Sequence, residues 1–291
     1  MNGAMLDLAG RFGLARRSGG YGGDCPVCGY ADAFTVRPMR DGRLMLFCHS
    51  GCDRDALEAE AAAALGSGWT PPPRQNRPVP HSDRHARQDR AQRLWEAARP
   101  CPGTLAEAYL ARRGIGHMAS SAALRFMPDC RHPGGTSHPA LISAVREADG
   151  VLVAVQRTYL ADDGRKAALD PARASLGPVW GAAVQLDPGG VALVIGEGME
   201  SSASAGQLLD LPAWAALSAG NLGRGLVLPA IVREVTIAAD HDATGVGQKA
   251  AEAAAQRWRA EGRTVRIATP DRLGADFADL AEARMAEAAH G

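Results

Sequence analysis

Lysine is almost absent from this chain, whose only two lysines are Lys166 and Lys249, so arginine carries nearly all of the positive charge. Net charge is absent too, because 32 basic residues balance 32 acidic ones, and this excludes a highly basic protein that coats nucleic acid. No apolar run reaches the roughly 18 residues that span a membrane, and residues 1–20 lack the layout of a secretory signal. We therefore expect a soluble, cytoplasmic protein with no membrane partner.

Cysteine is also scarce, with six in 291 residues, which is too few for a disulfide scaffold. Four of them form two close pairs: Cys25 and Cys28, then Cys48 and Cys52 after a nineteen-residue insert. Paired thiolates at this spacing predict a structural zinc site. His49 is equally competent chemically, and we favour Cys48 with His49 as the alternative. The insert reads as two short strands around Asp41-Gly42, a hairpin signal that would bring the pairs together.

The rest of the chain predicts further segments. After a zinc-binding module at 1–65 we expect a Pro- and Arg-rich linker at 66–93, entering a helix near Ala91. Residues 94–190 read as a mixed α+β domain, with strands at 140–145 and 151–159 joined by a turn. From residue 191 to 291, apolar strands alternate with helices, which is typical of a parallel α/β sheet. The predicted fold class is thus α/β multidomain.

Carboxylates follow two of these predicted parallel strands. Glu197 comes directly after one strand, and Asp240 and Asp242 follow a later one. The carboxyl ends of such strands line one edge of the sheet, where ligands bind. Crowded carboxylates repel one another unless a cation neutralises them, and oxygen ligands suit Mg²⁺ or Mn²⁺. Asp276 is a further candidate ligand, whereas His241 is expected to be structural.

This acidic pattern resembles the toprim domain of bacterial primases, topoisomerases and certain nucleases. A zinc-binding module, a mixed domain and a toprim domain, in that order, are similar to bacterial replicative primases and their small phage, plasmid and mobile-element relatives. The strand-turn-strand at 142–160 is similar to part of the primase basic subdomain, and Lys166 stands where that family has a lysine. The resemblance implies a zinc ribbon, a basic α+β subdomain and a Rossmann-like toprim sheet.

The same resemblance implies a DNA primase that makes RNA primers on single-stranded DNA from nucleoside triphosphates. Glu197, Asp240 and Asp242 would be catalytic and, with Asp276, would hold Mg²⁺ or Mn²⁺. Three basic residues would contact template or nucleotide: Arg146, Arg157 and Lys166. The zinc module would bind template, with Phe34 and Phe47 as stacking surfaces or as core residues, and any replicative helicase would act in trans. The alternatives are a toprim nuclease and a non-catalytic single-stranded nucleic-acid-binding accessory protein.

Overall fold

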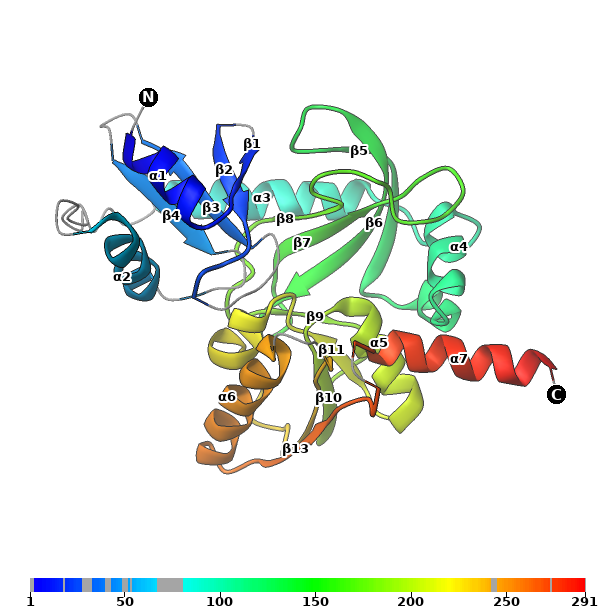
Figure 1. Ribbon diagram of the computed structural model, residues 1–291. Coiled ribbons are helices and arrows are strands. Elements are labelled where there is room, and N and C mark those ends of the chain that lie inside the picture. Colours follow the sequence, from blue (N-terminus) through cyan, green and yellow to red (C-terminus); the bar gives the residue numbers. More distant parts are fainter. Residues whose placement is uncertain are drawn as a thin grey trace. The chain divides into compact units, whose positions relative to one another are not determined.

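The computed structural model describes residues 3–17, 19–27, 33–39, 43–48, 52, 54–66, 81–241, 245–272 and 274–290. The chain forms two compact units, one built from residues 1–77 and the other mainly from residues 78–291 (Figure 1). Within the described residues, no helix is both long and apolar enough to cross a membrane.

The first unit is a small antiparallel sheet with two helices. Its described strands lie in the order β1-β2-β3-β4. Their bounds are β1 (Ala15–Arg17), β2 (Gly20–Gly23), β3 (Phe34–Pro38) and β4 (Leu44–Cys48), and the helices are α1 (Gly3–Arg11) and α2 (Arg54–Leu65). Burial alternates along β4, so that Leu44, Leu46 and Cys48 face the core while Met45 and Phe47 face outward. This period of two is what a sheet buried on one face requires, and it confirms the predicted hairpin.

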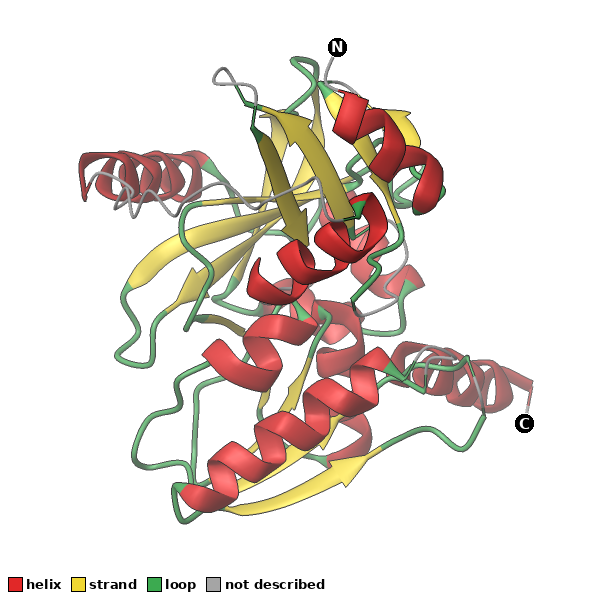
Figure 2. Cartoon of the chain, turned by 60° about the vertical axis from the view of Figure 1, so that its left-hand side comes forward, coloured by secondary structure: helices red, strands yellow, loops and turns green. Residues whose placement is uncertain are grey.

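The second unit is organised around one sheet, to which the described residues contribute nine strands (Figure 2). These are β5 (Leu124–Arg131), β6 (Ser137–Arg146), β7 (Leu152–Tyr159), β8 (Arg173–Leu176), β9 (Ala183–Gln185), β10 (Ala192–Gly196), β11 (Ala213–Ala215), β12 (Glu234–Ala238) and β13 (Thr264–Ala268). The helices are α3 (His81–Ala97), α4 (Leu105–Arg112), α5 (Met199–Leu209), α6 (Val246–Ala260) and α7 (Phe277–His290), with short turns η1 (Gly116–Ser120) and η2 (Asn221–Gly225).

The C-terminal part of this sheet is parallel, in the order β13-β12-β10-β11. From β10 the chain passes through α5 to β11 on one side, and β12 then lies on the other side of β10. Because such crossovers are almost always right-handed, the reversal puts α5 and α6 on opposite faces of the sheet (Figure 1). The alternating strands and helices expected from residue 191 onward are confirmed.

The mixed α+β region and the parallel region share this one sheet. β9 pairs antiparallel with β11 through Trp214↔Gln185 and also pairs antiparallel with β6 through Val145↔Val184. The three residues of β9 therefore join two regions that the sequence presents as separate domains. Backbone hydrogen bonds continue across this seam, so the two regions form one structural unit.

Part of the expected linker at 66–93 is helical, because α3 begins at His81, ten residues before the helix start expected near Ala91. Residues 67–80 of this linker lie outside the described residues. No proline or glycine interrupts the helix after its start, so nothing in the backbone opposes it. Its apolar contacts come late: Ala91 and Trp95, four residues apart, are buried in the core cluster beside β6 and β7. The strongly polar first half hides the helix from an amphipathicity argument.

Candidate functional site

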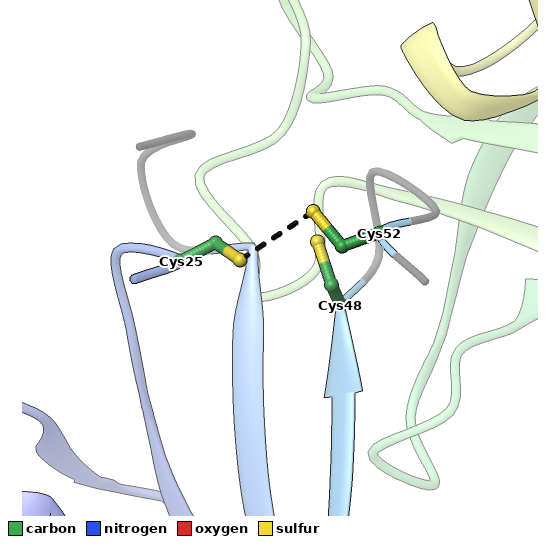
Figure 3. Close-up of side chains that lie close together, drawn as sticks. All are labelled: Cys25, Cys48 and Cys52. Carbon is green, nitrogen blue, oxygen red and sulfur yellow. Dashed lines mark hydrogen bonds between the residues drawn. The ribbon is translucent and has the colours of Figure 1, made fainter. Parts of the chain in front are cut away.

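Three cysteines of the first unit converge. Cys25 follows β2, Cys48 ends β4 and Cys52 lies just beyond it (Figure 3). Their sulfur atoms all lie within 4.8 Å of one another, and the Sγ atoms of Cys25 and Cys52 are 3.7 Å apart. That distance is far longer than the roughly 2.05 Å of a disulfide. It matches the edge of about 3.8 Å in a tetrahedron of Zn–S bonds near 2.3 Å.

The cluster therefore has the geometry of a metal-binding site, as the cysteine spacing predicts. Cys28, the fourth predicted ligand, and His49, the predicted alternative to Cys48, lie outside the described residues. Cys48 points into the cluster (Figure 3), which fits its assignment as a ligand. The lone cysteines differ: Cys101 and Cys130 are buried, and burial raises their pKa values to about 12 and about 11.

The two candidate stacking residues, Phe34 and Phe47, differ in solvent exposure. Phe34 is 0% exposed and packs edge-on against Phe12 in the module core. Phe47, on the outward face of β4, is 49% exposed. Phe34 therefore stabilises the fold, and only Phe47 is accessible to a base.

An acidic edge lies at the carboxyl ends of β10 and β12. Gly196 and Ala238 are paired in register, so Glu197, one residue past Gly196, and Asp240, two residues past Ala238, both follow strand ends at the same edge of the sheet. Neighbouring strands whose connections leave in opposite directions open a crevice at this edge, which is where α/β sheets bind ligands. The predicted Asp242 lies outside the described residues. Among the described residues, only the cysteine cluster brings three potential metal-ligand atoms within 4.8 Å of one another.

Backbone geometry at this edge is unusual. Leu217, just after β11, has a φ of 71°, a left-handed conformation that disfavours a side chain with a Cβ. Its N–H donates to the carbonyl of Glu197 at 2.8 Å, which fixes the β11 loop beside the β10 loop. Gly196 permits close packing of α5, since a Cβ there would lie 2.7 Å from Ser202 Oγ.

His241 connects the acidic edge to the segment before α7. Its Nδ1 lies 2.8 Å from the carbonyl oxygen of Pro270, and its N–H donates to the carbonyl of Ala275 at 3.1 Å. These bonds agree with the expected structural role of His241. They also bring Asp276, the residue after Ala275, toward the end of β12.

Asp276 also caps the start of α7. Its Oδ1 accepts the N–H of Asp279 at 2.9 Å, and the carboxylate of Asp279 accepts the N–H of Asp276 at 3.0 Å. This reciprocal pair satisfies amides that a helix start leaves open. The assignment of Asp276 as a metal ligand stays a prediction, and its carboxylate is already a helix cap.

A basic pocket of about 550 Å³ lies elsewhere in the second unit. Five cations line it, together with Tyr109 and Glu282: Arg112, Arg113, Arg165, Lys166 and Arg173. Only Lys166 was expected from the sequence. Its pKa is lowered, first by the neighbouring charge of Arg173 and then by burial, because an ammonium is disfavoured next to other cations. The pocket thus favours an anion that would relieve this repulsion.

A buried carboxylate, that of Glu200, binds two of the residues that line the pocket. Glu200, in the first turn of α5, accepts hydrogen bonds from the Tyr109 hydroxyl and from Arg173 Nη2. Burial opposes the charge of Glu200, but Arg173 and the Tyr109 hydrogen bond hold its pKa below the usual value of 4.5. Burial and the charge of Glu200 raise the pKa of Tyr109, so the phenol keeps its proton and donates. Glu200 lies three residues after Glu197, so α5 connects the acidic edge to Tyr109 and Arg173, two of the residues that line the pocket.

The other two cations predicted to contact template or nucleotide, Arg146 and Arg157, donate hydrogen bonds to backbone carbonyls. Arg146 Nη1 donates to the carbonyl of Gly150 at 2.9 Å and braces the β6–β7 turn. Arg157 donates to Arg131 at 2.9 Å and to Ala174 at 3.2 Å, which ties β7 to its neighbours. Arg157 also lines a separate pocket of about 410 Å³. The structure does not bring Arg146 or Arg157 into the pocket of Lys166.

Comparison with known proteins identifies the C-terminal region. Residues 192–287 match the family model of the toprim domain, and residues 85–186 match that of a domain of unknown function (DUF7146). The toprim resemblance of the acidic motifs is therefore confirmed, and the parallel region is a toprim domain. No protein of curated function matches the chain in sequence.

Several solved structures are similar to this chain at low sequence identity. The zinc-binding and RNA polymerase domains of the Aquifex aeolicus primase are 14% identical, with 98% of this chain and 82% of that one covered at a TM-score of 0.48. The primase fragment of the bacteriophage T7 primase-helicase is 17% identical, covering 89% and 92% at 0.42. The RNA polymerase domain of the Mycobacterium tuberculosis primase is 17% identical, covering 70% and 82% at 0.43.

The cysteine cluster predicts metal-dependent folding of the first unit alone. Cys25→Ser should lower bound zinc and expose residues 3–66 to hydrogen exchange, because structural zinc supplies about 10–16 kcal/mol in small domains. Residues 81–290 should keep their protection, because they form a separate unit. Metal analysis and exchange mass spectrometry measure both. Cys101→Ala is the matched control and should keep its zinc; loss of protection throughout the Cys25→Ser chain would contradict independent units.

The Glu200 cluster predicts a pH-dependent stability. The ionised carboxylate stabilises the fold above its usual pKa of 4.5, and this contribution is lost as pH falls through the lower folded value. Glu200→Gln should therefore flatten the acid side of the stability profile and cost about 1–3 kcal/mol at neutral pH. Urea unfolding followed by tryptophan fluorescence at several pH values measures this. Glu252→Gln, an exposed change on α6, should behave as wild type; equal slopes for all three proteins would refute the assignment.

Proposed function

We propose that this protein is a DNA primase, a nucleotidyltransferase that makes short RNA primers on single-stranded DNA. The observation that carries the proposal is that α5 connects two features: it follows the acidic toprim edge, and its Glu200 binds residues of a pocket lined by five cations. Primer synthesis needs both: carboxylates for divalent metal at the reacting phosphate, and cations for the rest of a triphosphate. The cysteine-bearing unit that precedes them supports the same function.

The pocket is our candidate seat for the triphosphate. Arg112 and Arg113 come from the end of α4, Arg165 and Lys166 from the turn after β7, and Arg173 from β8. Guanidinium groups bind phosphate oxygens through paired hydrogen bonds, whereas Lys166 supplies a compact charge. Arg113 is paired with Glu282 at 2.9 Å, so phosphate would compete with that carboxylate for it. Glu200 keeps Arg173 in place before any ligand arrives.

The donor set at the toprim edge suits Mg²⁺ or Mn²⁺, since Glu197 and Asp240 offer hard oxygen ligands. We propose Glu197, Asp240 and Asp242 as the catalytic carboxylates, with Asp276 as an outer member. When bound, divalent metal would stabilise charge on the attacking and leaving oxygens. The carboxylates would orient the 3′ hydroxyl of the primer against the phosphate. In the same proposal the cysteines hold structural Zn²⁺, and Phe47 offers a stacking surface for template.

A toprim nuclease is the second candidate, because the same acidic edge suits phosphodiester cleavage. The cation-lined pocket favours the primase, since a triphosphate carries more charge than the single phosphate that a nuclease must hold. Arg157 and Arg146 remain our candidates for secondary contacts with the template. Coupling to a replicative helicase in trans belongs to this proposal as well.

Asp240→Asn should abolish template-dependent incorporation of labelled ribonucleotides on circular single-stranded DNA while leaving the thermal unfolding transition intact, because one metal-binding oxygen is replaced by an amide. A loss of at least 100-fold is expected, as for an essential charge in the reaction. Product size on a denaturing gel, with Mg²⁺ or Mn²⁺, is the measurement.

The matched control is Glu234→Gln. Glu234 lies at the opposite, amino end of the same strand β12, so the control removes an acidic charge without touching the crevice. Incorporation by Asp240→Asn at the wild-type level would place the chemistry elsewhere. Metal-dependent cleavage of the circle, with no short products, would favour the nuclease.

A further inference from the structure

An exposed tryptophan marks the loop between β8 and β9. Trp180 is 57% exposed, whereas the other described tryptophans are buried: Trp95 at 6%, Trp214 at 2% and Trp258 at 0%. Exposing a large aromatic ring to water forgoes the free energy that its burial would supply. A single exposed ring does not by itself make a binding site. The structure of the loop that carries it is therefore the evidence for or against a binding role.

A buried side chain holds this loop rigidly. Asn221, 1% exposed at the start of η2, accepts the N–H of Gly181 on its Oδ1 at 2.9 Å. Its Nδ2 donates to the carbonyls of Ala182 and Ala216, both at 2.8 Å. The carbonyl of Gly181 in turn accepts the N–H of Val227 at 3.1 Å. The peptide groups that follow Trp180 are therefore fixed, and the ring is presented by an ordered backbone.

The indole itself lies against a position that only glycine can occupy. A Cβ at Gly225 would lie 2.7 Å from Trp180 Cε2, closer than two carbon atoms can approach. Gly225 ends η2, the same turn that begins with Asn221. One short turn thus supplies both the clamp for the loop backbone and the support beneath the ring, and the remaining surface of the ring faces solvent.

The clamp also connects the loop to the acidic edge. Ala216, whose carbonyl binds Asn221, follows β11 at its carboxyl end. The next residue, Leu217, donates its N–H to the carbonyl of Glu197. The loop that carries Trp180 is therefore linked to the acidic edge through three consecutive hydrogen-bonded segments.

Charge around the ring favours a polyanion. Arg224, next to Gly225, is exposed. Arg257 donates to the carbonyl of Leu226, the residue after η2, at 2.9 Å, and its guanidinium also pairs with Glu261 at 3.5 Å. Single-stranded nucleic acid is bound by aromatic rings that stack on bases and by cations that follow the backbone. A hydrophobic protein partner would instead require a broad apolar surface without such charges.

We propose that Trp180 is a stacking platform for an unpaired base of single-stranded nucleic acid at the toprim edge. The inference deepens the proposed primase function and rests on it for the identity of the strand. The rigid loop matters because an ordered ring loses little conformational entropy when a base stacks on it. An aromatic substitute should therefore keep most of the binding, and an aliphatic one should not.

The test uses the full chain in a Trp69→Phe background, since Trp69 lies outside the described residues. A labelled oligothymidylate is titrated by fluorescence anisotropy, without nucleotides, and tryptophan quenching is recorded with an unlabelled one. Trp180→Ala should weaken binding roughly tenfold, whereas Trp180→Phe should stay within about threefold. The oligonucleotide should quench the emission that iodide also quenches, and Trp180→Phe should lose this quenching.

The matched control is Ile231→Ala, which removes an apolar side chain that is 59% exposed in the same domain but cannot stack on a base. Its affinity should equal that of the parent. Equal oligonucleotide affinity for Trp180→Ala and the parent overturns the proposal, and so does a Trp180→Ala chain that only changes its sedimentation, since that points to a protein contact. Stacking at Trp180 in a chain that makes no primers would uphold this inference and refute the proposed function.

Discussion

The candidate site depends on the position of β10 at the centre of the parallel sheet. The chain leaves β10 toward β11 through α5, and β12 then takes the other side. In α/β sheets, ligands bind at the edge where two such connections leave in opposite directions. Glu197 and Asp240 are at this edge because they follow these two strands: Glu197 comes one residue after Gly196, and Asp240 comes two residues after its strand partner Ala238.

β9 extends this constraint to the rest of the unit. By pairing with β11 and with β6, it makes the mixed region a continuation of the toprim sheet. Tyr109 and the cations that line the basic pocket come from the mixed region, while Glu200, which binds Tyr109 and Arg173, comes from α5. A shared sheet restricts motion between these elements, so the acidic edge and the cations keep a fixed relation. Opposite charges are thus held close by backbone pairing and by one buried carboxylate.

The sequence predicts what depends on local pattern. The cysteine spacing, the hairpin of β3 and β4, the strands and helices after residue 191 and the toprim motif are all visible as spacing or periodicity. The structure confirms the convergence of Cys25, Cys48 and Cys52, the paired strands β3 and β4 and the alternating elements, and the family match confirms the toprim domain. The basic pocket is not visible, because Tyr109, Lys166, Arg173 and Glu200 come from four segments that only tertiary structure assembles. Glu200 follows Glu197 so closely that it reads as part of the same acidic motif, although it is buried beneath the pocket. Apart from Lys166, the available signal was the cluster Arg112-Arg113 at a helix end.

Arginine explains why charge alone could not separate binding residues from structural ones. A guanidinium has five donors and keeps its charge, so it can cap several backbone carbonyls at once. Arg157 and Arg263 each donate to two or more carbonyl oxygens. In a chain with only two lysines, arginines must therefore serve both as structural donors to backbone carbonyls and as candidate ligand-binding cations. The ammonium of Lys166 has only three donors and bonds fewer backbone carbonyls than a guanidinium does. A lysine in this arginine-rich chain therefore predicts the pocket better than any single arginine does.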